Sequence, residues 1–387
     1  MGMRKRILFV NPTSEISGAE VSLLLLLQGL DKTKYQPVLL LPNEGLLSER
    51  AIEMDVQVEY FPMHIFMINA HILDSLREGL RALPQVRNIN NVLRSLDVDL
   101  VHLNSYQVGI TFSWAAKQLG VPSIWHFRDI PRSSLKRKFI SWCTKLPNRV
   151  IAISHAVANA IGGVNQENIV VVHNGVNLKL FDRVNRGKFR EELEIDENVT
   201  LVSSIGQLVP WKGQDLLLRV FAKISHERPM HLAIVGGTVS VAWTDTDQIE
   251  QYSQYLRDLV IDLGLESKVT FTGFRDDIPQ ILVDSNIYVH TAMRPEPFGR
   301  VIIEAMAARR PVIAPNWGGI PEIVEQNRTG WLFIPRDESD LFDKLNNALH
   351  RRDQWEKMGL TGYELVREKF TDKYHVNKVQ QVYAELL

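Results

Sequence analysis

Two glutamates, Glu296 and Glu304, stand with seven residues between them in a stretch that leads into a helix predicted at Ile302–Ala308. Gly299 permits a tight turn, and the main-chain amides that follow it open the N-terminus of that helix. Such an end binds anions, so it suits a diphosphate, and carboxylates beside it can accept hydrogen bonds from sugar or ribose hydroxyls. A helix capped by Pro and Gly would give the same pattern, so this stretch alone leaves both interpretations open.

Three further loops of similar type follow predicted strands in the same half of the chain. Lys212 ends the loop Ile205–Gly213, where a mobile cation can meet a phosphate. Gly236-Gly237 and Gly318-Gly319 allow close approach of a ligand to the main chain. Because the carboxyl ends of parallel strands meet at one edge of a sheet, four such loops predict a phosphate-binding edge there.

The chain alternates short apolar runs with stretches of helical periodicity, which is typical of parallel sheets covered by helices. We therefore predict an α/β fold of two doubly wound, Rossmann-like domains, residues 1–180 and 181–372. The predicted strands of the first are 7–11, 38–41, 56–61, 100–103, 123–126, 150–153 and 169–172. Those of the second are 201–205, 232–235, 269–272, 287–290, 312–314 and 330–333. Two such sheets facing each other would bind a ligand in the cleft between them.

Composition fits a protein with two full cores and no disulfide. The chain has 387 residues, 45% of them hydrophobic, a net charge of −1 and the single cysteine Cys143. This charge argues against a general binder of nucleic acid, although residues 1–180 hold 19 Lys and Arg against 14 Asp and Glu. The apolar run Ile7–Val10 is too short for a signal core. We expect a cytoplasmic protein and leave open an association with the inner face of a membrane.

Two predicted helices of the first half have an apolar stripe beside basic residues, which also occurs in helices that lie on anionic membranes. We favour the other interpretation, in which the stripes face the core. The stripes are Leu73, Leu76, Leu80 and Leu83, and Leu135, Phe139, Trp142 and Leu146.

Taken together, these motifs resemble the retaining GT-B glycosyltransferases of family 4 over almost the whole chain. Their order and spacing agree with that family, although each loop alone is a weak signal. The matching stretches are Ser17–Glu20, His126, Ile153-Ser154, His173–Val176, Gly206–Gly213, Gly236-Gly237, Val269–Phe274, Glu296–Glu304 and Gly318–Glu322. The resemblance implies the GT-B fold, with a final helix at 373–387 that crosses back to the first domain.

The resemblance also implies a role for each matched position. Glu304 would bind the ribose, Glu296 the hydroxyls of the donor sugar, and Lys212 the diphosphate. His126 would face the donor sugar near its anomeric carbon, and Gly18 would let the main chain approach the phosphates or the acceptor. The remaining positions would bind the donor mainly through the main chain: Gln207, Gly236, Phe274, Arg275, Phe298, Gly299, Arg300 and Val301. No cofactor or metal is implied.

One position departs from the family pattern, which usually has Arg where this chain has Gln207. A neutral amide donates hydrogen bonds but does not offset phosphate charge. Either Lys212 suffices, or Arg275, Arg294 or Arg300 assists it, or the chain is an inactive homologue. Asp97-Val-Asp99 and Asp245-Thr-Asp247 match a metal-binding Asp-x-Asp formally, but acids commonly mark turns at such places.

The sequence therefore predicts a metal-independent, retaining hexosyltransferase. We expect transfer of glucose from UDP-glucose to a hydroxyl of a polysaccharide or of a lipid-linked oligosaccharide. A GT-B sugar-nucleotide epimerase and a non-catalytic sugar-nucleotide-binding partner of another transferase are the alternatives. The first would need no acceptor, and the second is suggested only by Gln207.

Overall fold

The computed structural model describes residues 4–63, 72–163, 167–226, 228–237 and 246–387, with the side chains of the second range described from residue 84 onward. It divides into two compact units, Met1–Gly175 with Asp372–Leu387, and Val176–Thr371. The division falls at residue 175, where the sequence suggested 180, and the C-terminal helix groups with the first unit. Residues 64–71 and Asp245 lie outside the described ranges.

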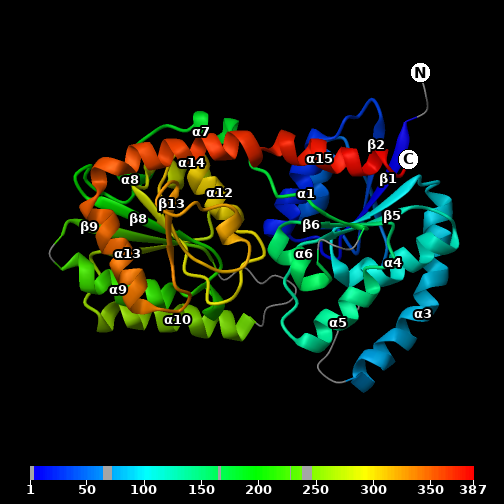
Figure 1. Ribbon diagram of the computed structural model, residues 1–387, viewed down its shortest axis with the longest axis horizontal. Coiled ribbons are helices and arrows are strands. Elements are labelled where there is room, and N and C mark those ends of the chain that lie inside the picture. The colour runs from blue at the N-terminus through cyan, green and yellow to red at the C-terminus, as the bar shows by residue number, and fades with distance from the viewer. Residues whose placement is uncertain (1–3, 64–71, 164–166, 227, 238–245) are drawn as a thin grey trace. The chain divides into compact units, whose positions relative to one another are not determined.

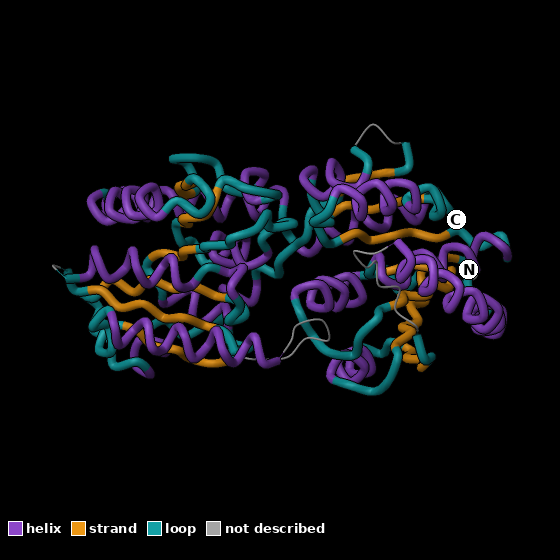
Figure 2. The backbone as a smooth tube through the Cα atoms, turned by 90° about the horizontal axis from the view of Figure 1, so that it is seen from below, coloured by secondary structure: helices purple, strands orange, loops and turns teal. Residues whose placement is uncertain are grey.

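The first unit is built on a seven-stranded parallel sheet in the order β3-β2-β1-β4-β5-β6-β7 (Figure 1). Its strands read as continuous apolar runs because both faces of the sheet are covered by helices, as Figure 2 shows for each unit. The strands are β1 (Lys5–Val10), β2 (Tyr35–Leu41), β3 (Gln57–Tyr60), β4 (Leu100–Leu103), β5 (Ser123–Phe127), β6 (Arg149–Ala152) and β7 (Ile169–Val171).

Seven helices accompany this sheet in the described residues. They are α1 (Gly18–Gly29), α2 (Leu46–Glu53), α3 (Ile72–Ser95), α4 (Tyr106–Gln118), α5 (Ser134–Cys143), α6 (His155–Ile161) and α15 (Asp372–Ala384). A capping box starts α1, in which Glu20 accepts hydrogen bonds from the main-chain N–H and the hydroxyl of Ser17. Helix α15 packs beside α1, and its Gln380 accepts the N–H of Asp31 at 2.8 Å.

The second unit repeats this topology in a six-stranded parallel sheet, with the order β10-β9-β8-β11-β12-β13. The strands are β8 (Thr200–Ile205), β9 (Met230–Val235), β10 (Val269–Gly273), β11 (Ile287–Val289), β12 (Val312–Pro315) and β13 (Gly330–Phe333). In both sheets the strand order reverses beside the first strand, and ligands of such sheets bind at that switch point. All thirteen predicted strands are therefore confirmed, and with them the two doubly wound sheets.

The helices of the second unit include the two that matter most for the site, α9 and α12. The α-helices are α7 (Lys179–Asp182), α8 (Lys188–Glu192), α9 (Gln214–Ser225), α10 (Thr246–Asp262), α11 (Ile278–Asp284), α12 (Arg300–Ala307), α13 (Glu338–His350) and α14 (Trp355–Lys369). The 3-10 turns are η1 (Pro210–Lys212), η2 (Ile320–Glu322) and η3 (Arg352–Gln354).

The expectation that the apolar stripe of α5 faces the core is wrong for two of its members. The Leu135 side chain is 62% exposed and that of Trp142 is 65% exposed. The buried residues of α5 are Ile140 and Cys143, which lie beside the stripe rather than on it. The stripe predicted on α3 falls on side chains outside the described set. Among the described residues, no helix combines the length and apolarity that crossing a membrane requires.

Candidate donor-binding site

The Gly-rich loops of the second unit touch one another at the carboxyl edge of its sheet. A Cβ built on Gly236 would stand 1.9 Å from the carbonyl oxygen of Gly206, and one on Gly318 would stand 2.2 Å from that of Glu296. The N–H of Gly319 donates to the same Glu296 oxygen at 2.8 Å. Any side chain at these glycines would force the loops apart. The predicted convergence of the loops is therefore confirmed, and the loops approach one another closely enough for their main chains to be in contact.

The loop after β11 enters α12 through Gly299, which has a φ of 103° and is the N-cap of the helix. This left-handed conformation favours glycine, and glycine offers no side chain to cap the first amides. Phe298 is buried edge-on against Phe370, with ring centroids 5.9 Å apart. This contact holds the loop against the C-terminal end of α14. The N–H groups from Arg300 onward therefore open a helix N-terminus at the sheet edge, as predicted.

Lys212 and Glu296 form an ion pair at this edge, with 3.1 Å between Nζ and Oε2. Both side chains keep about a fifth of their surface exposed, 23% and 20%. The turn η1 presents Lys212, and it is tied to the loop after β11 because Thr291 Oγ1 donates to the Lys212 carbonyl at 2.9 Å. The two residues expected to hold phosphate and sugar therefore lie in direct contact.

His290 completes this cluster, and its role was not foreseen from the sequence. Its Nε2 lies 3.4 Å from the Glu296 carboxylate, and its Nδ1 lies 3.0 Å from the hydroxyl of Tyr288. Burial lowers the pKa of His290, so the ring is neutral at pH 7, and burial raises the pKa of Tyr288 well above its ordinary value. In the sequence, only its position as the last residue of the predicted strand 287–290 marked His290 out.

The charge of Glu296 is fixed by these neighbours. Burial alone would raise its pKa, but the Lys212 ammonium and the contact with His290 outweigh burial and hold the pKa well below its ordinary value of 4.5. Glu296 is therefore a carboxylate at any physiological pH. A permanent negative charge suits a group that accepts hydrogen bonds from hydroxyls.

Glu304 sits one turn into α12 and is nearly fully buried. It pairs with Arg300 four residues before it, yet burial dominates and raises the pKa of Glu304. Because this pair engages the Arg300 guanidinium, Arg300 is a less suitable substitute for the cation missing at Gln207.

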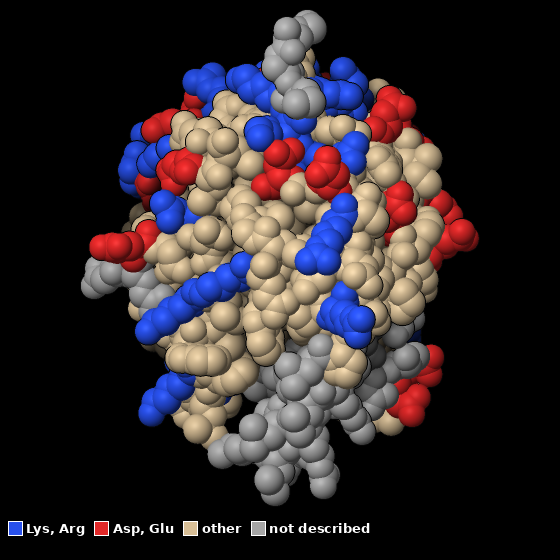
Figure 3. Space-filling view, turned by 90° about the vertical axis from the view of Figure 1, so that its right-hand side faces the viewer, with Lys and Arg blue, Asp and Glu red and all other residues tan. Residues whose placement is uncertain are grey.

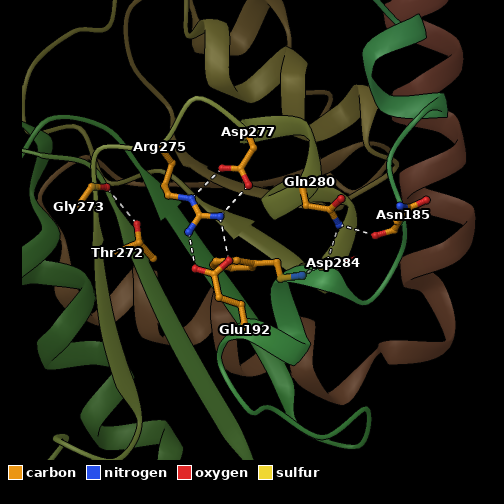
Figure 4. Close-up of polar contacts among 9 residues, drawn as sticks. Asn185, Glu192, Thr272, Gly273, Arg275, Asp277, Gln280 and Asp284 are labelled. Atoms are coloured by element: carbon orange, nitrogen blue, oxygen red, sulfur yellow. Dashed lines mark hydrogen bonds and ion pairs between the residues drawn. The ribbon is translucent and has the colours of Figure 1, made fainter.

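Arg275 is also held by carboxylates, as Figure 4 shows. Its Nε and Nη2 donate to Asp277 at 2.8 and 2.7 Å, and Nη1 and Nη2 donate to Glu192 on α8. Its guanidinium also lies over the ring of Phe189. These hydrogen bonds, first to Asp277 and then to Glu192, raise the pKa of Arg275. These contacts stabilise the loop after β10. They also pair the Arg275 guanidinium with carboxylates, although the sequence made this residue a candidate ligand for phosphate.

Phe274, which directly precedes Arg275 in the chain, has a side chain that is 66% exposed. A Cβ on Gly237 would stand 3.0 Å from the Phe274 N, so the loops after β9 and β10 also touch.

Gln207 lies on the turn between Gly206 and Lys212, and its carbonyl accepts a hydrogen bond from the Gln214 side chain of α9 at 2.9 Å. Arg294 lies 5.0 Å over the ring of Trp211, next to Lys212 in the chain. Among the candidate cations, Arg294 therefore lies beside the turn that carries Lys212.

Two of the predicted site residues, Gly18 and His126, belong to the first unit. Gly18 starts α1, and a Cβ built there meets no described atom within 4 Å, so packing does not require glycine. His126 was expected at a strand tip, but β5 continues through Phe127 and His126 is fully buried. It stacks on His375 of α15, with ring centroids 5.8 Å apart.

Among the described residues, the candidate metal-binding acids do not form a cluster. Asp99 is engaged by the Lys5 ammonium and the Arg6 N–H, both at 2.8 Å. Within the described ranges, no group of three His, Cys, Asp or Glu side chains is placed to hold a metal ion. Cys143 is buried, and burial raises the pKa of its thiol to about 12, which suits a core residue rather than a nucleophile.

Family models place this site in a known group. A model described as "Glycosyltransferase Family 4" matches residues 16–180, and one described as "Glycosyl transferases group 1" matches residues 185–365. Together they cover most of both units and the Gly-rich loops of the candidate site. The chain belongs to the family 4 glycosyltransferases.

Individual relatives are distant. N-acetyl-alpha-D-glucosaminyl L-malate synthase of Bacillus anthracis is 26% identical over 240 residues, which is 62% of this chain and 60% of that protein. A GDP-mannose-dependent alpha-(1-6)-phosphatidylinositol monomannoside mannosyltransferase of Mycobacterium tuberculosis (strain ATCC 25618 / H37Rv) is 33% identical over 194 residues, 48% of this chain and 47% of that protein. The matched part thus spans about half to three fifths of these relatives.

Solved structures agree in fold over the full length. The Anabaena protein HepE in complex with UDP is 24% identical, covers 98% of this chain and 100% of its own, and superimposes with a TM-score of 0.83. Sucrose-phosphate synthase from Thermosynechococcus elongatus is 20% identical, covers 99% of each chain and gives a TM-score of 0.79. These similarities confirm the GT-B fold.

Proposed function

We propose that this family 4 protein transfers a hexose, glucose in the first instance, from a UDP-sugar to an acceptor hydroxyl with retention of the anomeric configuration. The observation that supports this most is the Lys212–Glu296 pair beside the open N-terminus of α12. A diphosphate needs a cation and main-chain amides, and a sugar needs a fixed hydroxyl acceptor. All three meet within a few residues here. The complexes of HepE with UDP and with UDP-glucose favour a uridine donor.

In the proposed mechanism, the bond between the anomeric carbon and the leaving phosphate oxygen breaks as the acceptor oxygen attacks from the same face. The departing phosphate oxygen takes the acceptor proton. Lys212 and the amides from Arg300 onward offset the charge that develops on the diphosphate, which is the largest contribution such a site makes. Glu296 holds the sugar hydroxyls and favours the positively polarised ring at the transition state. His126 of the first unit faces the sugar when the donor is bound.

These cations take the place that a metal ion holds in other sugar-nucleotide sites. Lys212 is the main one in our proposal, and Arg294 assists it because Gln207 supplies no charge. The ribose would be bound by Glu304, and the base would lie beside Gly273–Arg275, recognised chiefly through the main chain.

The stereochemical outcome tests this proposal. UDP-glucose should be incubated with the enzyme and a panel of glycan and lipid-linked glycan acceptors, and the product linkage read by NMR. We expect an α linkage, and a β linkage would contradict retention. The same spectra without acceptor test the epimerase alternative, because an epimerised UDP-sugar would then accumulate. Slow hydrolysis of the donor would argue against a non-catalytic binding partner.

We further propose that α5 brings the first unit to an anionic membrane, where a lipid-linked acceptor would lie. Its exposed Leu135 and Trp142 stand in the stretch Ile130–Val150, which holds six Lys and Arg and no Asp or Glu. On the face of this unit drawn in Figure 3, Lys and Arg gather at the top, Asp and Glu lie just below them and at the edges, and a few Lys and Arg stand among uncharged side chains across the middle. Exposed Trp and Leu beside basic charge is the pattern of an interfacial helix.

Vesicle binding tests this contact. Wild type should sediment with phosphatidylglycerol vesicles and not with phosphatidylcholine vesicles, and Leu135→Ser with Trp142→Ser should abolish sedimentation. The matched control is Ile52→Ser, which alters a side chain that is 57% exposed on α2 of the same unit. Equal sedimentation of both variants would refute the role of α5.

A further inference from the structure

Arg128 stands at the centre of a largely buried polar network in the first unit. Its Nε donates to Asn104 Oδ1 and its Nη1 to Asn174 Oδ1, both at 2.9 Å, and its Nη2 lies 3.3 Å from His126 Nδ1. Asn104, Asn174 and His126 are all buried. They follow or end the strands β4, β7 and β5, so the network occupies the carboxyl edge of the first sheet.

The direction of every hydrogen bond in this network follows from Arg128, because a guanidinium only donates. Asn104 must present its oxygen to Arg128, so its amide group donates to Asn11 Oδ1 at 2.8 Å. Asn11 in turn donates to Glu20 Oε1 at 3.2 Å. Glu20 is the capping-box residue of α1 that stands two positions after Gly18. The network thus connects the loop at Gly18, which was expected to approach a ligand, to His126. It also fixes the orientation of the His126 ring.

The same argument assigns the proton of His126. Since Arg128 donates to Nδ1, this nitrogen carries no proton, and a neutral ring then has its proton on Nε2. His102 Nε2 also lies 3.1 Å from His126 Nδ1, so His102 must donate there. That leaves His102 Nδ1 as an acceptor, and the hydroxyl of Tyr383 lies 2.7 Å from it. Tyr383 belongs to α15, 281 residues from His102 along the chain.

The electrostatics agree with neutral rings throughout this cluster. Burial, and secondly the positive charge of Arg128, lower the pKa values of His102 and His126 well below the ordinary value. Burial lowers the pKa of His375, which stacks on His126, to about 4, while its Nδ1 donates to the His173 carbonyl at 2.7 Å. His126 Nε2 is buried and has no hydrogen-bond partner among the described residues. An unpaired N–H in such a place is costly, so it points to a ligand.

We propose that Arg128, His102 and Tyr383 are positioning residues that hold His126 as the Nε2–H tautomer, which donates a hydrogen bond to an oxygen of the donor sugar. The inference rests on the proposed function for the identity of that sugar, but the tautomer follows from the network alone. Helix α15 thereby helps to orient His126, because Tyr383 of this helix starts the series of hydrogen bonds that ends at His126. A neutral donor would bind the sugar without removing a proton from the acceptor.

The tautomer is measured directly by NMR of the full-length protein labelled with 15N at histidine. The His126 signals are assigned by their absence from the spectrum of His126→Gln. We expect His126 Nδ1 to resonate as an unprotonated ring nitrogen and Nε2 as a protonated one, at pH 7 and without substrate. A protonated Nδ1 would overturn the proposal. This result does not depend on any activity, so it separates the failure of this inference from that of the proposed function.

A kinetic test uses Tyr383→Phe, which removes one buried hydroxyl and keeps the ring. With UDP-glucose as donor, we expect kcat to fall about five- to tenfold, the loss expected for one hydrogen bond, while the Kd of UDP is unchanged. Tyr35→Phe is the matched control, because Tyr35 packs edge-on against Tyr383 with centroids 5.6 Å apart. Equal kcat values for the two variants, or an equal rise in the Kd of UDP, would show that Tyr383 acts only through packing.

Discussion

Glu296→Gln is the substitution that separates the roles of the two charged residues at the donor edge. It keeps the size of the side chain and removes the negative charge that now faces Lys212 at 3.1 Å. In the free protein that carboxylate neutralises the cation expected to hold the diphosphate. The variant therefore replaces a charged acceptor for sugar hydroxyls with a neutral one and releases Lys212 at the same time.

The magnitudes follow from this geometry. Loss of a preorganised charge at the transition state lowers kcat by about 10²–10³-fold in comparable sites, which is about 3–4 kcal/mol of the barrier. The Kd of UDP should stay the same or tighten, because the product diphosphate meets a less neutralised Lys212. Since the pair is about one fifth exposed and Gln still accepts a hydrogen bond, the free energy of unfolding should drop by only about 1–2 kcal/mol.

The stability difference also has a predicted pH dependence. The pKa of Glu296 is lower in the folded protein than its ordinary value of 4.5, so its ionised form stabilises the fold above that pH. The advantage of wild type over Glu296→Gln should be constant from pH 8 to about pH 5. It should then shrink as the pH falls below 4.5. Urea unfolding at several pH values measures this difference.

The assay pairs steady-state turnover of UDP-glucose with calorimetric binding of UDP. Glu338→Gln is the matched control, since Glu338 forms an exposed ion pair with Lys223 on the same unit. We expect the control to behave as wild type in both measurements. A tenfold weaker Kd for UDP in Glu296→Gln, with kcat retained, would place Glu296 on the nucleotide and refute the reasoning.

Three other substitutions test neighbouring parts of the site. Gly18→Ala should leave the thermal midpoint unchanged, because a Cβ has room there, but should weaken binding of UDP-glucose about tenfold if the main chain approaches the donor; unchanged binding in calorimetry would contradict that approach. Gln207→Arg should tighten UDP about three- to tenfold and should reduce the effect of Arg294→Ala on kcat, whereas independent effects would show that Arg294 does not substitute for the missing cation. Phe274→Ala should change the Kd of UDP less than about threefold, since the base is expected to be read through the main chain; a larger loss would indicate stacking on this ring.

The fold could be predicted from the sequence because its signals are local. Apolar runs such as Leu201–Ile205 are buried on both faces of a parallel sheet, so every predicted strand appeared where expected. The convergence of the Gly-rich loops followed from the same geometry. Gly318 and Gly236 confirm it through main-chain contacts that no other residue would allow.

The contacts between side chains could not be predicted in the same way, because partners distant in sequence decide them. Arg275 was a candidate for phosphate until the fold brought Glu192 to it, 83 residues away in the chain. His126 was expected at the tip of a strand, yet β5 is one residue longer and His375 of α15 stacks on the His126 ring. For α5, periodicity gave the correct stripe but not the side on which the core lies, because basic residues flank that stripe in either case.

The central claim is that Lys212 and its neighbours form the site for the diphosphate of a uridine donor. Thermal unfolding of wild type, Lys212→Met and the surface control Lys223→Met, each with UDP, UDP-glucose, GDP or ADP, tests it most directly. We predict that UDP and UDP-glucose raise the Tm of wild type and of Lys223→Met, and raise that of Lys212→Met far less. Equal shifts in all three proteins, or no shift of wild type with any of these nucleotides, would contradict the account.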